Sequence, residues 1–129
     1  MAGLADMKLT VEAPFDRAVK RVRTALAGQD LEIAGELELA AEQRSRVLLV
    51  DCPLLVFAGL ALDRAAGVYF PLHVLLVADG RRTQVSTMRL SEAWGVRLPA
   101  GAAGPIDQLE ARVAKALAKV GGAVALERG

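Results

Sequence analysis

Two segments of the chain alternate between apolar and polar residues, a pattern that indicates β-strands with one buried and one wet face. The first segment runs from Met7 to Ala13, and the second runs from Leu31 to Leu39. Gly35 lies on the apolar side of the second segment, where it predicts a β-bulge or the close approach of another element. Between the two strands, apolar residues from Phe15 to Leu26 recur at helical spacing and predict a helix.

The middle of the chain is more apolar than its beginning. Residues 47–50 (Val-Leu-Leu-Val) do not alternate, and this run predicts a strand that is covered on both faces. We expect a second helix over residues 54–66 and a mostly apolar strand over residues 68–78. The sequence Asp-Gly-Arg-Arg at residues 79–82 predicts a hairpin turn into a further strand at residues 83–88.

A loop rich in Gly, Ala and Pro is expected at residues 99–105, followed by a last helix over residues 106–120. The element order is therefore β-α-β-β-α-β, then β-α. It predicts one α+β domain over residues 1–129, with a ferredoxin-like split βαβ core, an extra β-hairpin strand and a C-terminal helix. The predicted contacts between the first helix and the sheet involve Val19, Val22, Leu26, Leu31, Ile33 and Leu37.

Hydrophobic residues make up 53% of the chain, and charged residues make up only 24%. Several predicted elements are apolar on more than one face, so a single layer of helices does not cover them all. We therefore expect the chain to associate with itself as a homodimer.

The single cysteine cannot form an internal disulfide, and we therefore expect a cytoplasmic protein. Residues 1–10 show no basic leader before an apolar block, and no secretory signal is expected. The longest uncharged apolar run, residues 52–62, is shorter than the ~18 residues of a membrane-spanning helix. The lack of Asn and the excess of Arg over Lys fit a thermophile or a GC-rich genome.

The balance of 16 basic and 15 acidic residues argues against a nucleic-acid-binding protein. The first predicted helix carries Arg17, Lys20, Arg21 and Arg23, which we interpret as a solvated face because no aromatic stacking platform accompanies them. The glycines of residues 101–104 lack the Lys-Ser/Thr of a phosphate-binding loop and indicate a linker. We expect neither a nucleic-acid partner nor a membrane partner.

Five short signatures occur in the chain in a fixed order. They are Pro14-Phe15-Asp16-Arg17-Ala18-Val19, the Leu31–Leu39 strand, Cys52-Pro53, Phe70-Pro71-Leu72-His73-Val74 and Asp79-Gly80. In this order they resemble the bacterial and archaeal family called domain of unknown function 302, over about Met7 to Met88. The resemblance implies an α+β domain that forms homodimers and has no established activity. The family usually places Asn-Pro at the start of the second helix, where this chain has Cys52-Pro53.

Asp51, Cys52 and His73 form the candidate ligand pocket, since they surround the start of the second helix and the next strand. A thiol at a helix N-terminus is acidified by the helix dipole, and a Cys–His pair makes a thiolate nucleophile. In the ferredoxin-like arrangement, however, the strands of Cys52 and His73 run the same way with one strand between them. The two side chains would then stand about 10 Å apart, too far for a hydrogen bond. A buried, inert thiol and a cap at Asp51 are the simpler interpretations.

One Cys and one His fall short of the three or four ligands that zinc requires, and we expect neither a metal nor a cofactor. The sequence therefore favours a homodimeric binding or interaction domain that holds a small ligand, without a catalytic residue. Two alternatives stay open. One is an enzyme that uses the Cys52 thiol, and the other is a regulatory amino-acid-binding module, by analogy of fold.

Overall fold

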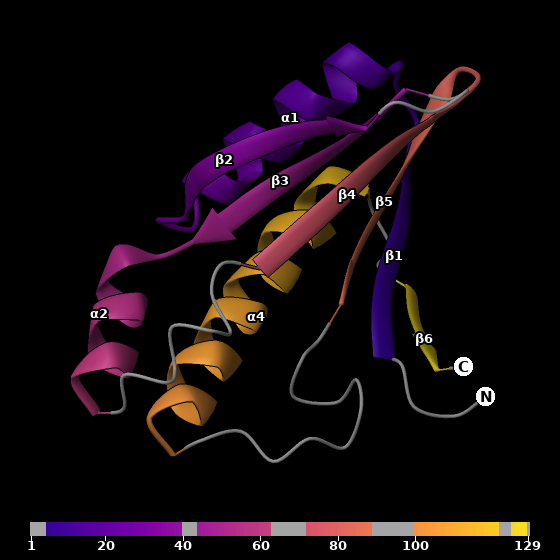
Figure 1. The fold of residues 1–129 in the computed structure, drawn as a ribbon. Helices are drawn as coiled ribbons and strands as arrows, with labels where there is room; N and C mark the ends of the chain where they lie inside the picture. The colour runs from indigo at the N-terminus through magenta and orange to yellow at the C-terminus, as the bar shows by residue number, and fades with distance from the viewer. Residues whose placement is uncertain (1–4, 40–43, 63–71, 89–99, 122–124, 129) are drawn as a thin grey trace.

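The computed structural model describes residues 5–39, 44–62, 72–88, 100–121 and 125–128 (Figure 1). The predicted end of the second helix and the predicted start of the following strand fall within residues 63–71, which lie outside the described residues. Residue 99, the first of the predicted loop, also lies outside them. The elements in chain order are β1 (Ala5–Val11), α1 (Phe15–Ala27), β2 (Glu32–Leu39), β3 (Ser45–Asp51), α2 (Pro53–Leu62), β4 (Leu72–Asp79), β5 (Arg82–Met88), α4 (Ala100–Gly121) and β6 (Ala125–Arg128).

The strands form one antiparallel sheet in the order β2-β3-β4-β5-β1-β6. The expected α+β class is confirmed, but the strand order differs from the expected ferredoxin-like core. β3 and β4 are antiparallel neighbours, with Val50 opposite Leu72, and no strand lies between them. The cause is the β4–β5 hairpin, which enters the sheet as a unit between β3 and β1.

The β4–β5 hairpin has the predicted tight turn. Asp79 lies opposite Arg82, so Gly80 and Arg81 form a two-residue connection. Gly80 has a φ of 62°, a left-handed conformation that glycine adopts without steric cost.

All three described helices belong to one layer, on one side of the sheet (Figure 1). α1 contacts β2, β4 and β5, α4 contacts β1, and α2 packs against α4. We call this side of the sheet the helix side, and the other side the open face. Fully buried side chains between the sheet and these helices include Val11, Val22, Leu26, Leu48, Val50, Val74, Leu76, Val85, Val113 and Leu117.

The predicted phase of α1 is confirmed, because Val19, Val22 and Leu26 are all buried. The end of the helix is built by Asp30 rather than by a glycine. Asp30 has a φ of 59°, and the N–H of Leu31 donates to the carbonyl of Leu26, as in a Schellman motif. Leu31 and Leu26 are both buried, so the turn that stops α1 also anchors the start of β2 in the core.

β2 contains the β-bulge that Gly35 predicts. Ile33 lies opposite Val50 and Gly35 lies opposite Leu49, so Ala34 is an extra residue without a partner on β3. A bulge of one residue reverses the alternation of the strand beyond it. The prediction that Leu37 faces the core is therefore wrong: Leu37 lies opposite Val47, points to the open face and is 53% exposed.

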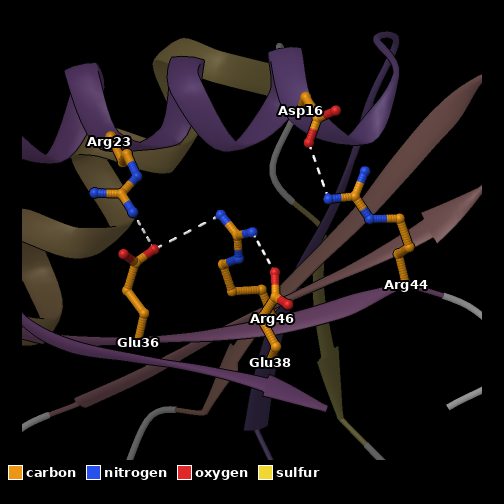
Figure 2. A network of polar contacts seen from close by, with 6 residues as sticks. All are labelled: Asp16, Arg23, Glu36, Glu38, Arg44 and Arg46. Atoms are coloured by element: carbon orange, nitrogen blue, oxygen red, sulfur yellow. Dashed lines mark hydrogen bonds and ion pairs between the residues drawn. The ribbon is translucent and has the colours of Figure 1, made fainter. Parts of the chain in front are cut away.

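The same bulge turns Glu36 and Glu38 to the helix side, where they meet cations (Figure 2). Glu36 pairs with Arg23 of α1 and lies 3.8 Å from Arg46, which also pairs with Glu38. A second link joins Arg44 to Asp16 at 3.0 Å. Beyond the bulge, ion pairs therefore attach the outer edge of the sheet to α1, whereas Leu31 and Ile33 at the start of the strand pack against the hydrophobic core.

The last helix begins earlier than predicted. α4 starts at Ala100 and contains Pro105, whereas the sequence predicted a loop up to that proline. Three alanines in the first four residues favour the helix, and Pro105 removes only one backbone donor near its start. β6 was not predicted; it pairs with β1 as an edge strand of four residues.

Val22→Asp should destabilise the protein by about 3 kcal/mol or more, because it buries an unpaired charge between α1 and the sheet. Arg21→Asp, one residue away on the exposed side of α1, should change the free energy of unfolding by less than about 0.5 kcal/mol. Urea unfolding followed by circular dichroism measures both. Equal losses in the two variants would contradict the orientation of α1.

Candidate interaction site

The open face carries a continuous apolar surface over β2, β3 and β4. We call it the apolar patch; it consists of Leu37, Leu39, Val47, Leu49, Leu75 and Val77. Cross-strand pairing makes it continuous, since Val47 lies between Leu37 on one side and Leu75 on the other. Leu37 is 53% exposed and Leu39 is 45% exposed, while the other four side chains are partly buried by their neighbours.

On β5 and β1, the described side chains of the open face are polar and bound the patch. Thr10 of β1 lies opposite Gln84 of β5 and donates a hydrogen bond of 2.9 Å to its side-chain oxygen. The amide nitrogen of Gln84 in turn donates to Asp79 at 3.0 Å. An antiparallel sheet with one wet face shows such polar residues on every strand. The apolar patch is the exception to that pattern.

A second apolar surface lies on the outer side of α2. Leu54 is 81% exposed and Phe57 is 75% exposed, and Leu60 belongs to the same side. On the opposite side of the helix, Leu55 is buried in the core. α2 extends past the end of β3, so this surface is separate from the apolar patch (Figure 1).

The structure distributes the three candidate pocket residues over both sides of the sheet. Asp51 and His73 lie at the same end of β3 and β4 and face the open side, where His73 is paired with Leu49. Cys52 lies on the helix side and is 3% exposed. The expected intervening strand is absent, and the residues are closer along the sheet than predicted. The opposite orientation of the side chains, rather than distance, separates Cys52 from His73.

Cys52 has a structural environment. Its carbonyl oxygen accepts hydrogen bonds from the N–H groups of Leu55 and Val56, which places it at the start of α2 as predicted. Its Sγ accepts a hydrogen bond of 3.4 Å from Nη1 of Arg112 on α4. The Cys52 thiol thus links the end of β3 to α4, and α2, which begins next to Cys52, also packs against α4.

Asp51 is electrostatically disfavoured as a carboxylate. Partial burial raises its pKa above the ordinary value, and the negative charge of Glu32 raises it further. Glu32 lies directly opposite Asp51 across β2 and β3. Like charges in this position destabilise a sheet. The ionised carboxyl group of Asp51 is therefore electrostatically unfavourable, and it lies beside the apolar patch.

The sequence identified the residues of the apolar patch as apolar but assigned Leu37 to the wrong side. Gly35 is the signal that corrects the assignment. A Cβ atom at this position would lie 3.3 Å from Cδ1 of Leu49, so glycine keeps the bulged strand close to β3.

Among the described residues, no three His, Cys, Asp or Glu side chains come together in a group able to hold a metal ion. Within the same residues, the helices are too short or too polar to cross a membrane.

Comparison with known proteins supports the resemblance seen in the sequence. Residues 7–120 match the model of the family described as Domain of unknown function DUF302, so the match extends past β5 through most of α4. The fold is similar to the crystal structure of an uncharacterised conserved protein DUF302 from Bacillus stearothermophilus. The two share 13% sequence identity with a TM-score of 0.77, over 89% of this chain and 97% of the other. No curated protein matches the sequence.

Asp51→Asn should stabilise the protein at neutral pH. Because the folded state raises the pKa of Asp51, ionising this group costs stability as the pH rises above about 4, through the raised value. The variant should gain up to about 1 kcal/mol at pH 7 and nothing below both pKa values. Urea unfolding across this pH range measures the difference. A variant less stable than the parent at pH 7 would show that the carboxylate is favourable.

Cys52 should react with iodoacetamide at least about ten-fold more slowly in the native protein than in the urea-unfolded chain, since alkylation requires local opening. The matched control moves the thiol to an exposed position in Cys52→Ala/Leu54→Cys, which should react like a free thiol. A native rate at Cys52 equal to or above that of this control would support the thiol-enzyme alternative.

Proposed function

The chain belongs to the DUF302 family, and we propose that it acts as a homodimeric interaction domain that pairs through the apolar patch on the open face of its sheet. The observation that carries the proposal is the exposure of Leu37 and Leu39 beside the apolar side chains of β3 and β4. A contiguous apolar surface of this kind on a small domain indicates an interface.

A second copy of the chain is the partner that the charges favour. With 16 basic and 15 acidic residues, two copies repel each other only weakly. A two-fold axis through the apolar patch would place Leu and Val side chains against the same side chains of the other copy, which makes the surface complementary to itself. The polar strip around Thr10 and Gln84 would form the wet rim of such an interface.

The proposed dimer also predicts where the candidate ligand pocket lies. Asp51 and His73 border the apolar patch on the open face, and His73 is the cross-strand neighbour of Leu49. In the dimer these polar groups from both copies would line the junction between the subunits. A small ligand held by the protein would bind at this junction rather than at Cys52.

The two alternatives receive less support. Cys52 is buried on the helix side and hydrogen-bonded by Arg112, an environment typical of a structural thiol. The amino-acid-binding alternative depended on a ferredoxin-like strand order, from which this sheet differs. We also propose a cytoplasmic location, because the single cysteine forms no internal disulfide and reducing compartments favour such chains.

Light scattering coupled to gel filtration tests the dimer. The parent protein should have twice the mass of the 13.6 kDa chain at micromolar concentration. Leu37→Lys/Leu49→Lys should yield a folded monomer, because it places charges within the apolar patch.

Leu54→Lys/Phe57→Lys is the matched control on the outer side of α2, and it should remain dimeric. Circular dichroism verifies that both variants are folded. A monomeric parent protein would contradict the proposal, as would a dimer that only the α2 variant dissociates.

A further inference from the structure

An open groove of about 550 Å³ runs between α1 and α4, on the side of the molecule away from the apolar patch. Four cations form its rim: Arg17, Lys20 and Arg21 from α1, and Lys119 from α4. Lys20 and Arg21 follow Arg17 by three and four positions, so the three side chains share one side of the helix. Residues about one hundred positions apart in the sequence thus build one positively charged rim.

These four cations lack carboxylate partners within the described part of the chain. The ion pairs there involve Arg23, Arg44, Arg46 and Arg82 instead. Asp16, the acidic residue next to Arg17, is held by Arg44, which lowers the pKa of its carboxyl group. The acidic residue nearest to the three α1 cations is therefore engaged elsewhere, and within the described residues no carboxylate pairs with the cations of the groove.

The floor of the groove is apolar. It is formed by Ala25 of α1 and Val120 of α4, which both pack against the hydrophobic core. The lining contains no aromatic side chain, and a stacked nucleobase therefore has no platform. A cationic rim over a small aliphatic floor is complementary to a molecule with an anionic head and an aliphatic body.

We propose that the groove between α1 and α4 binds an aliphatic phosphate ester, with the phosphate between the rim cations and the alkyl chain on Ala25 and Val120. A free small molecule can present this combination of a phosphate and an aliphatic chain, and so can an acidic lipid, through its phosphate and acyl chain. The groove lies on the helix side, so binding there is independent of dimerisation through the open face.

Nuclear magnetic resonance titration of the parent protein with hexyl phosphate tests the site. The backbone amides of Thr24, Ala25 and Val120 should shift, and binding should weaken at high salt. Hexyl phosphate should bind several-fold more tightly than inorganic phosphate, because the alkyl chain covers the apolar floor. A parallel cosedimentation with vesicles of phosphatidylglycerol or phosphatidylcholine determines whether a lipid headgroup is the source of the ligand.

Arg17→Gln/Arg21→Gln should weaken binding of hexyl phosphate, or of phosphatidylglycerol vesicles, by about ten-fold or more. Arg81→Gln/Arg82→Gln removes the same charge from the β4–β5 hairpin and should leave binding unchanged. Lys119→Gln should weaken binding several-fold, since α4 supplies one side of the groove.

Three results would overturn the proposal. The first is no binding of either hexyl phosphate or phosphatidylglycerol vesicles. The second is equal weakening by the groove and hairpin variants, which would indicate attraction by net charge alone. The third is equal affinity for hexyl phosphate and inorganic phosphate, which would show that the apolar floor has no part in recognition.

Discussion

The β-bulge at Ala34 determines which side of the sheet each later residue of β2 faces. Beyond it, Leu37 joins the open face, and Glu36 and Glu38 face α1. A regular strand continued from Ile33 would bring Leu37 to the helix side and the two glutamates to the open face. The bulge therefore extends the apolar surface of β3 and β4 outward to the edge of the sheet, and it supplies the carboxylates that hold α1.

The contacts beneath α1 show how the protein tolerates a polar layer on its helix side. Arg46 is shared between Glu36 and Glu38 (Figure 2). Its guanidinium carbon lies 5.7 Å from the centroid of the Phe15 ring. Arg44 lies over the same ring at 4.6 Å. Such partly exposed pairs each contribute little to stability. They connect the edge of the sheet to α1, the helix that carries three of the four cations of the groove.

Much of the fold follows from local patterns in the sequence, but its long-range arrangement does not. The helical phase of Val19 to Leu26, the hairpin at Gly80 and the bulge at Gly35 are each decided by a few neighbouring residues. The position of the β4–β5 hairpin between β3 and β1 depends on pairings between distant strands, which no local pattern encodes. The meeting of Lys119 with α1 was missed for the same reason. The side reversal of Leu37 has a local cause, the bulge that Gly35 marks, but the predicted alternation was continued through the bulge unchanged.

If a second copy of the chain covers the apolar patch, isotope-filtered nuclear Overhauser spectroscopy detects the contact between the two copies directly. Labelled and unlabelled protein are mixed, unfolded and refolded together, so that half of the dimers carry one labelled chain. For a dimer that forms through the apolar patch, we expect intermolecular contacts among the methyl groups of Val47, Leu49 and Leu75. Intermolecular contacts confined to Leu54 and Phe57 of α2, or no intermolecular contacts at all, would contradict it.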